Sequence, residues 1–436
     1  MDTPVSPTTP ATHFLLYGWC FHRQGLPITA MRARIGRRLF PGLHGRARPD
    51  VSAAFGGVPG SGTSGYEIAV SLPVRPQPCH LEARLDDGGW HAVQTFSLTP
   101  PPHRVWRERL RWSRFWANAW LGRPQAWPLV SPEEQRYLLG WAQHRGWLNI
   151  GIWSQYAPRP VAEERFPAPH RPAGKLPKIT IVTPSFNQAA FLEATMRSVL
   201  DQPGVRLDYI VQDGGSTDGS ADLVRRYAPR LKHGESAPDD GQADALRRGF
   251  ARSECGPDDV MAYLNSDDLL MPGTARFVAE YFARHPAVDV VYGHRVLIDD
   301  DSMEIGRWYS PRRACDDLRL HDLVPQETLF WRKRIWDRVG GVDPSFHFAV
   351  DWDLLLRFEA AGARIARLPW FLGQFRLHPQ QKTQKWIERV GIPEMDRLRL
   401  RTLGRMPAAE EMQASMRRAQ FDSALVCALF QRGWRL

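Results

Sequence analysis

The stretch LDYIVQDGGSTDGS, residues 207–220, contains the pattern from which the fold can be predicted. Its first five residues are mostly apolar and predict a buried strand. The strand runs into Gln212 and Asp213 and then into two glycines, which allow the backbone to turn sharply. A helix is expected to begin near Ser220. This order of strand, polar turn and helix is typical of an α/β domain.

The same order of elements recurs on both sides of this stretch. Residues 179–183 predict another buried strand and residues 189–200 a helix, while residues 260–264 predict a later strand that ends at NSDD, 265–268. Open α/β sheets bind their ligands beyond the carboxyl ends of the strands. We therefore expect the polar residues after these strands to form one ligand site.

The carboxylates at this edge suit particular ligands. Asp213 can accept hydrogen bonds from a base or a ribose, and Asp267 and Asp268 offer hard oxygen atoms to Mg²⁺ or Mn²⁺, which such sites share with substrate phosphates. The aspartate pair could instead cap the helix expected after Pro272. Polar motifs at three successive strand ends favour the ligand site.

Residues 178–385, about half of the chain, resemble the family 2 glycosyltransferases, whose catalytic domain has the Rossmann-like GT-A fold. The matching motifs occur in the order found in that family: TPSFNQ (183–188), QDGGSTDGS (212–220), DDGQADA (239–245), LNSDD (264–268), VGGVD (339–343), DWDL (351–354) and FRLH (375–378). The resemblance implies that this domain uses a nucleotide-diphospho-sugar as its donor.

The resemblance also implies which residues bind the donor. Thr183, Pro184 and Asp213 match the nucleotide pocket of the family, and Asp239 and Gln242 match its second donor-side loop.

Three further positions match the metal site and the catalytic base. Asp267 corresponds to the donor-binding metal ligand of the DXD motif, and Asn265 stands where the first carboxylate of that motif usually is. His378 corresponds to a position that can touch the metal or the diphosphate, and Asp351 to the base. The resemblance implies Mn²⁺ or Mg²⁺ as the cofactor. From the residues alone, Asp351 could instead cap a helix and His378 could be structural.

The implied reaction fits these residue types. An acceptor hydroxyl has a high pKa and needs a base such as Asp351, whereas the departing nucleoside diphosphate gains negative charge that a metal at Asp267 would stabilise. Displacement in line then inverts the anomeric carbon. A QxxRW motif, found in processive synthases, is absent. We expect a metal-dependent, inverting, hexosyltransferase-type enzyme that moves one sugar to a glycan or lipid-linked acceptor in cell-surface polysaccharide biosynthesis, with Gln326 and Glu327 as candidates for facing the acceptor.

Three other functions are considered. A catalytically weak or inactive glycan- or polyanion-binding scaffold is kept open by Asn265. Nucleotidyl transfer would need a basic phosphate-binding loop, but residues 183–188 carry no charge. A glycoside hydrolase could use two carboxylates, yet the loops of Asp213 and Asp239 would then have no purpose.

The remaining segments differ in composition. We expect a disordered tail over 1–12, a small β-sandwich-like accessory domain over 13–98, a Trp/Arg/Pro-rich connector over 99–177, the GT-A domain over 178–385 and a helical extension over 386–436. Within the β-domain, residues 66–72 predict a strand and residues 81–96 a hairpin. The stretch GSGTSG, 60–65, matches the dinucleotide pattern GxGxxG but leads into a strand, so we reject it as a nucleotide site.

Positive charge is concentrated in the first part of the chain. Residues 1–178 hold 22 Lys/Arg and 11 Asp/Glu, whereas residues 179–436 hold 35 and 36. Residues 104–120 predict a helix with Trp112, Trp116 and Trp120 on one face and interleaved arginines, which suits either a peripheral contact with an anionic membrane or packing between domains. The surplus could also be a solvated basic surface, and no nucleic acid partner is expected.

Cellular location is predicted from two absences. No apolar stretch reaches the roughly 18–20 residues of a spanning helix, and no signal-peptide pattern opens the sequence. The five scattered cysteines, without a CxxC pair, are typical of reduced thiols. We expect a soluble cytoplasmic protein, with a peripheral position at the inner membrane face as an option.

Overall fold

The computed structural model describes residues 13–46, 48–55, 58–71, 77–98, 139, 142, 146–167, 175–312, 314–379, 381–382 and 386–435. These residues group into two compact units. The first runs to Ala157 and includes Arg417–Ala428, and the second comprises Pro158–Met416 and Leu429–Leu436. The expected tail (1–12) and the Trp/Arg-rich helix (104–120) lie outside the described residues.

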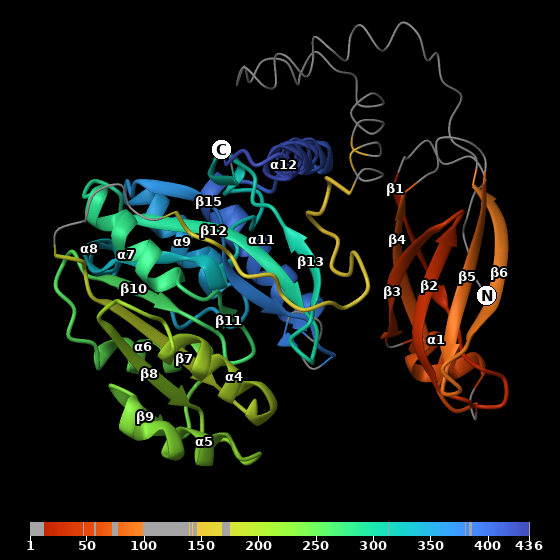
Figure 1. Ribbon diagram of the computed structural model, residues 1–436, viewed down its shortest axis with the longest axis horizontal. Helices are drawn as coiled ribbons and strands as arrows, with labels where there is room; N and C mark the ends of the chain where they lie inside the picture. Colours follow the sequence, from red (N-terminus) through yellow and green to blue (C-terminus); the bar gives the residue numbers. More distant parts are fainter. Residues whose placement is uncertain are drawn as a thin grey trace, which may run out of the picture. The chain divides into compact units, whose positions relative to one another are not determined.

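The first unit contains an antiparallel six-stranded sheet (Figure 1). In spatial order its strands are β1 (His13–Trp19), β4 (Gly65–Ser71), β3 (Arg38–Arg46), β2 (Ile28–Ile35), β5 (Gln77–Leu85) and β6 (Trp90–Leu98). The predicted hairpin is confirmed as β5–β6 and the predicted strand as β4. The glycine-rich stretch forms a short 3₁₀ turn (Ser61–Thr63) and leads into the strand β4, as expected from the sequence. The short helix α1 (Pro49–Ala54) was not predicted.

The sheet of the first unit folds over one core. Buried residues of β1 and β4, such as Leu16 and Ile68, share a cluster with those of β2 and β5, such as Ala33 and Leu81. The strand β3 pairs with β2 at its start and with β4 at its end. Where it changes partner, Gly42 lies so close to the side chain of Ile68 that a Cβ would be 2.3 Å from Ile68 Cγ1. A glycine is therefore required at this corner.

The second unit contains a nine-stranded mixed sheet, which confirms the α/β class. Its spatial order is β11 (Leu269–Leu270), β15 (Ile365–Arg376), β12 (Val290–Ile298), β14 (Phe330–Arg332), β10 (Val260–Tyr263), β7 (Ile179–Ser185), β8 (Leu207–Asp213) and β9 (His233–Ser236), with β13 (Glu304–Trp308) paired to β12. The strands β10, β7, β8 and β9 are parallel, so their carboxyl ends meet at one edge.

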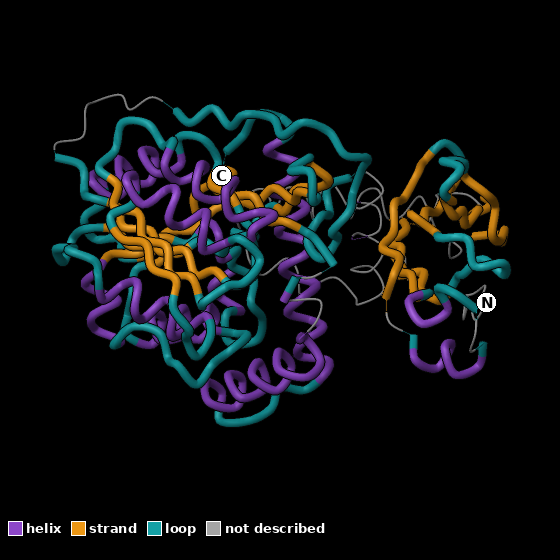
Figure 2. Tube along the Cα trace, turned by 90° about the horizontal axis from the view of Figure 1, so that it is seen from below, coloured by secondary structure: helices purple, strands orange, loops and turns teal. Residues whose placement is uncertain are grey.

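Helices lie on both sides of this sheet (Figure 2). The helices described in the second unit are α4 (Ala189–Leu200), α5 (Ser220–Tyr227), α6 (Gln242–Ala251), α7 (Thr274–Arg284), α8 (Lys333–Val339), α9 (Val350–Ala360) and α11 (Ile392–Leu403), and α12 (Ala409–Phe430) is divided between the two units. The strand β7 is buried along its whole length. The helix α4 buries Leu192, Met196 and Val199, which share one helical face.

Residues 386–435 are mostly helical, with a π-helical turn (Ile387–Gly391) before α11. Within the described ranges, no helix combines the length and the apolar character that crossing a membrane requires.

Candidate active site

The loops after β7 and β8 are joined by hydrogen bonds at the carboxyl edge of the sheet. The amide of Asn187 donates to Ser216 Oγ at 2.7 Å, and the amide of Thr217 donates to Asn187 Oδ1 at 3.1 Å. Asn187 has a left-handed backbone (φ 52°), which asparagine tolerates better than most residues. The carboxylate of Asp218 accepts from the amide of Ala189, in the first turn of α4, at 2.8 Å. These loops are therefore fixed by internal contacts.

Asp213 lies at the end of β8 and is fully buried. Its carboxylate accepts hydrogen bonds from the amide and the hydroxyl of Ser216, at 2.9 and 2.6 Å, and from Ser236 Oγ at 2.6 Å. The hydroxyl of Thr183 accepts a hydrogen bond from Tyr209 in the interior, at 2.9 Å. Any contact of Thr183 with a nucleotide would therefore come from its main chain.

Asp239 packs directly against the loop that follows β8. A Cβ on Gly214 would lie 3.0 Å from Asp239 Oδ2, so a glycine is needed for this approach. The other carboxylate oxygen of Asp239 accepts from the amide of Gly241 at 2.9 Å. Burial raises the pKa of Asp239 above its usual value. The structure thus brings together the two loops that were predicted to bind the donor.

A chain of side-chain amides crosses the site. Gln242 Nε2 donates to Asn265 Oδ1 at 2.7 Å, and Asn265 Nδ2 donates to Gln326 Oε1 at 3.0 Å. Gln326 Nε2 in turn donates to the carbonyl oxygen of Tyr263 at 2.8 Å. An aspartate at position 265 could accept from Gln242 but could not donate to Gln326. Asn265 therefore completes this network, which gives a structural reason for its departure from the DXD motif.

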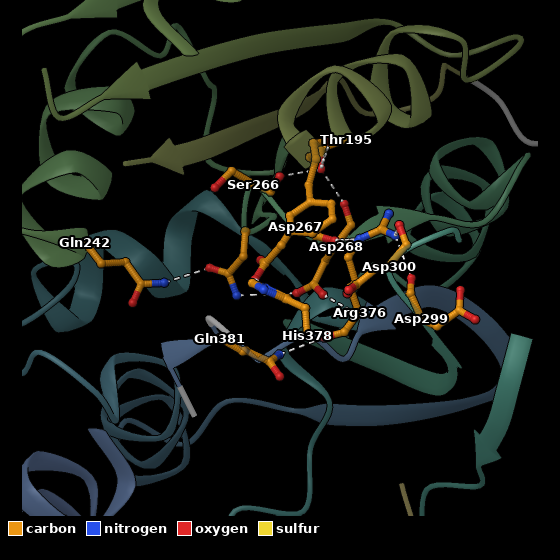
Figure 3. Close-up of polar contacts among 12 residues, drawn as sticks. Thr195, Gln242, Ser266, Asp267, Asp268, Asp299, Asp300, Arg376, His378 and Gln381 are labelled. Atoms are coloured by element: carbon orange, nitrogen blue, oxygen red, sulfur yellow. Dashed lines mark hydrogen bonds and ion pairs between the residues drawn. The ribbon is translucent and has the colours of Figure 1, made fainter. Parts of the chain in front are cut away.

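The candidate metal ligands Asp267 and His378 contact one another (Figure 3). Asp267 Oδ2 and His378 Nε2 are 3.0 Å apart, and the ring of Phe191 packs on the imidazole with centroids 4.7 Å apart. A carboxylate and an imidazole at this separation can both bind one divalent ion. In the part of the chain that the structure describes, no cluster of three or more His, Cys, Asp or Glu side chains could hold a metal. Two ligands are compatible with an ion that also binds substrate phosphates and water.

Asp268 has a structural environment distinct from that of Asp267. It is buried and accepts the amide of Arg376 at 3.0 Å. Burial and the neighbouring carboxylates of Asp267 and Glu327 raise the pKa of Asp268 well above its usual range. The helix α7 begins after Gly273 with no side chain capping it, so the alternative that the aspartate pair caps this helix is wrong.

Arg376 holds the loop of Asp267 in place. Its guanidinium donates to the carbonyl oxygens of Asp267, Asp299 and Asp300, at 2.9, 2.8 and 3.0 Å (Figure 3). The hydroxyl of Thr195 donates to carbonyls of the same loop from the opposite side. These contacts fix the loop between α4 and β15.

Asp351 lies in the first turn of α9 and does not occupy the N-cap, which is Ala349. Its Oδ1 atom accepts the amide of the next residue, Trp352, at 3.0 Å. Burial raises the pKa of Asp351, while the charges of Lys382 and Arg295 oppose this shift. A carboxylate with a raised pKa is a better proton acceptor than an ordinary surface aspartate.

Two residues near Asp351 were missed by the sequence analysis. Lys382 donates from Nζ to Gln242 Oε1 at 2.6 Å, and burial lowers its pKa to about 8 although the Asp351, Glu394 and Asp267 carboxylates oppose this. The carboxylate of Glu394, on α11, accepts the consecutive amides of residues 347–349 at 2.8, 2.8 and 2.9 Å. The one feature of the sequence that could have pointed to Lys382 is its position four residues after His378.

Glu327 is not available to an acceptor. It is buried and forms two hydrogen bonds with the guanidinium of Arg295, at 2.8 and 2.6 Å. Gln326 is buried as well and belongs to the amide network. The expectation that both residues face the acceptor is therefore wrong for Glu327.

Comparison with known proteins gives one family. Residues 180–341 match the model described as glycosyl transferase family 2. A PGL/p-HBAD biosynthesis glycosyltransferase of Mycobacterium tuberculosis is 27% identical over 197 residues, which cover 44% of this chain and 73% of the relative. An uncharacterized glycosyltransferase of Nostoc sp. is 26% identical over 225 residues, covering 46% of this chain and 65% of that protein. The resemblance seen in the sequence is confirmed over this region.

Two solved structures align with this chain at low sequence identity. S. aureus TarS aligns with a TM-score of 0.41 and 16% identity, over 56% of this chain and 42% of TarS, so less than half of TarS is spanned. A mannosyltransferase from Pyrobaculum calidifontis, solved in complex with GDP-Man and Mn²⁺, aligns with a TM-score of 0.42 and 19% identity, over 68% of this chain and 86% of that one.

Proposed function

We propose that the protein transfers one sugar, with inversion, from a nucleotide-diphospho-sugar to a glycan or lipid-linked acceptor, since residues 180–341 match the model of glycosyl transferase family 2. The observation that carries the proposal is the grouping of Asp351 with the Asp267–His378 pair. The Asp351 and Asp267 carboxylates both raise the pKa of Lys382 against the effect of its burial, which supports one site for the proposed base and the proposed metal ligands.

The residues of the candidate site each have a role in this reaction. The loops of Asp213 and Asp239, which contact one another through Gly214, hold the nucleotide. Asp351 accepts the proton of the acceptor hydroxyl as that oxygen attacks the anomeric carbon, and the bond from this carbon to the diphosphate breaks on the opposite face. A divalent cation, Mn²⁺ or Mg²⁺, held by Asp267 and His378 would supply positive charge to the leaving diphosphate.

A panel of donors tests this function without knowledge of the acceptor. The midpoint of thermal unfolding is measured with UDP-, GDP-, CMP- and dTDP-sugars, each with Mn²⁺, with Mg²⁺ and with EDTA. A ligand at about 100 times its Kd adds about 2.7 kcal/mol to the stability of the folded state. We expect one nucleotide class to raise the midpoint, and to do so more strongly with metal. No shift with any donor, in a folded sample, would contradict the proposal.

The setting that we propose is cell-surface polysaccharide biosynthesis at the cytoplasmic face of a membrane. It is supported by the excess of Lys and Arg in residues 1–178 and by the tryptophans of residues 104–120. Cosedimentation with vesicles tests the membrane contact. We expect binding to vesicles that contain anionic phosphatidylglycerol, weakened by salt, and no binding to pure phosphatidylcholine. Equal binding to both would contradict an electrostatic contact.

The inactive scaffold is the alternative that Asn265 had kept open. The amide of Asn265 accepts from Gln242 and donates to Gln326, so the substitution has a structural explanation that requires no loss of activity. No observation in the described residues favours the scaffold.

A further inference from the structure

Lys382 has an environment that is unusual for a lysine. Its ammonium group has three N–H donors, and the structure gives it one hydrogen-bond acceptor among the described residues, Gln242 Oε1. The carboxylates of Asp351, Glu394 and Asp267 are close enough to influence its pKa, yet none of them forms an ion pair with it. The ring of Phe348 lies 6.0 Å from Nζ. Two donors of a partly buried cation therefore remain available to a ligand.

The other cationic side chains near the site are already engaged. Arg376 donates to main-chain carbonyls and Arg295 pairs with Glu327. Arg248, beside Asp239, is bonded to Asp244 and to the carbonyl of Pro238. Among the described residues around the site, Lys382 is thus the cation with the most unused donor capacity.

Lys382 lies where the diphosphate of a bound donor is expected. Gln242, to which it is bonded, belongs to the donor-side loop that begins at Asp239, and Asp351 lies at the reacting side. In a nucleotide sugar the diphosphate joins the nucleoside to the sugar. A donor held at the Asp239 loop and attacked beside Asp351 therefore has its diphosphate between them, where Lys382 lies.

We propose that the ammonium of Lys382 binds the diphosphate of the donor and supports nucleotide binding even when no metal is bound. This inference rests on the proposed donor class. Charge-assisted hydrogen bonds to phosphate oxygens occupy the two free donors. The amide of Asn265 contributes as well, because a neutral side chain there leaves the diphosphate with one fewer carboxylate to repel it.

The test measures affinity for UDP and GDP by isothermal titration with the full chain, first in EDTA and then in Mn²⁺. Lys382→Met removes the charge and keeps a similar side-chain length, whereas Lys382→Arg keeps the charge. The matched control is Lys232→Met. Lys232 precedes β9 at the opposite edge of the sheet and pairs with Glu254 at 3.0 Å.

We expect wild-type protein to bind one of the two nucleotides in EDTA. Lys382→Met should weaken this binding about tenfold or more, equivalent to about 1.4 kcal/mol, and Mn²⁺ should recover part of the loss. Lys382→Arg should stay within about threefold of wild type, and Lys232→Met should not differ. Far-UV circular dichroism and the unfolding midpoint of each variant confirm that it is folded.

Two results would overturn the inference and leave the proposed function intact. These are equal affinity of Lys382→Met and wild type in EDTA, and wild-type binding that requires Mn²⁺ absolutely. If the wild-type chain bound neither nucleotide in either condition, nor any donor of the thermal panel, the proposed function would fall together with this inference.

Discussion

At the scale of single residues, Asp351 gives the most direct test of the chemistry. Asp351→Asn keeps the size of the side chain and an oxygen that can still accept the amide of Trp352, but it cannot take up a proton. We expect the transfer rate to fall by about 10²–10⁴-fold while nucleotide affinity stays unchanged. In wild type, kcat/KM should rise with pH through a pKa above that of an ordinary aspartate, because burial raises the pKa of Asp351 and only the ionised form is a base.

The control for this variant is Asp337→Asn, which changes an exposed aspartate of α8 paired with Lys333. Transfer by Asp351→Asn at the wild-type rate would show that another group is the base. Loss of nucleotide affinity in Asp351→Asn would indicate a defect in the site rather than in proton transfer.

His294 is expected to make stability depend on pH. It is fully buried, its Nδ1 atom accepts the amide of Ser310 at 3.1 Å, and burial followed by the charge of Arg367 lowers its pKa well below the usual value. A lowered pKa in the folded state means that stability is complete above the unfolded pKa of about 6.5 and decreases as pH falls below it. The decrease should approach about 1.4 kcal/mol per pH unit until the folded pKa is reached.

This prediction is checked by urea unfolding at several pH values between 5 and 8. His294→Asn, whose Oδ1 atom can accept from Ser310, should be less stable overall but should depend less on pH in this range. His285→Asn, at an exposed position after α7, is the control and should keep the wild-type dependence. Parallel curves for His294→Asn and wild type would contradict the assignment.

How much of the site could be predicted depends on how far apart in the sequence the contacting residues are. The strand pattern placed Asp213 and Asp267 at one edge of the sheet, and the resemblance to a known family added Asp239, His378 and Asp351. Lys382 and Glu394 were missed, because their partners are 140 positions away in one case and up to 47 in the other. Contacts of this kind follow from how the helices and loops pack, which periodicity does not reveal.

At the scale of elements, α11 holds the start of α9. Glu394 accepts three successive amides of the turn before Asp351, and it is buried. Glu394→Gln keeps one acceptor oxygen but turns an NH₂ group toward amides that also donate. We expect a loss of about 1–3 kcal/mol in the free energy of unfolding, and a lower kcat with unchanged nucleotide affinity.

Glu388→Gln is the matched control, since Glu388 is exposed in the turn that precedes α11. A Glu394→Gln variant that loses stability and keeps its kcat would show a contribution to folding alone. A selective loss of kcat, by contrast, would support a role of α11 in positioning the base.

Burial explains which elements were predictable. The strands β7, β8 and β10 are short and largely or wholly buried, so their apolar residues stand out from the polar turns that follow them. The strand β9 (HGES) has no apolar side chain and was missed, because its position depends on pairing with β8. The order of strands across the sheet also depends on pairing between distant segments, which the sequence pattern does not encode.

At the scale of the whole molecule, the two compact units have separate cores. Leu16, Ile68 and Leu81 belong to the core of the first unit, whereas Ile181, Met196 and Phe330 belong to that of the second. We therefore expect two unfolding transitions in calorimetry, of which only one shifts when a nucleotide sugar binds.

The variant Gly42→Val shows which unfolding transition belongs to which unit. A valine has no room beside Ile68 and should lower the first unit's transition only, without affecting nucleotide binding. A single unfolding transition, whose midpoint is shifted both by nucleotide and by Gly42→Val, would show that the units unfold cooperatively.

The hydrogen bonds between the loops after β7 and β8 have a consequence for binding kinetics. Asn187, Ser216 and Asp218 hold these loops in one conformation through contacts within the protein itself. A rigid pocket has little conformational entropy to lose when a ligand arrives, so association on this side should follow a single exponential without a slow rearrangement phase. The preference for one nucleobase would then be set by fixed shape. Laboratory evolution toward another nucleotide would have to change this scaffold and could not simply loosen a flexible loop.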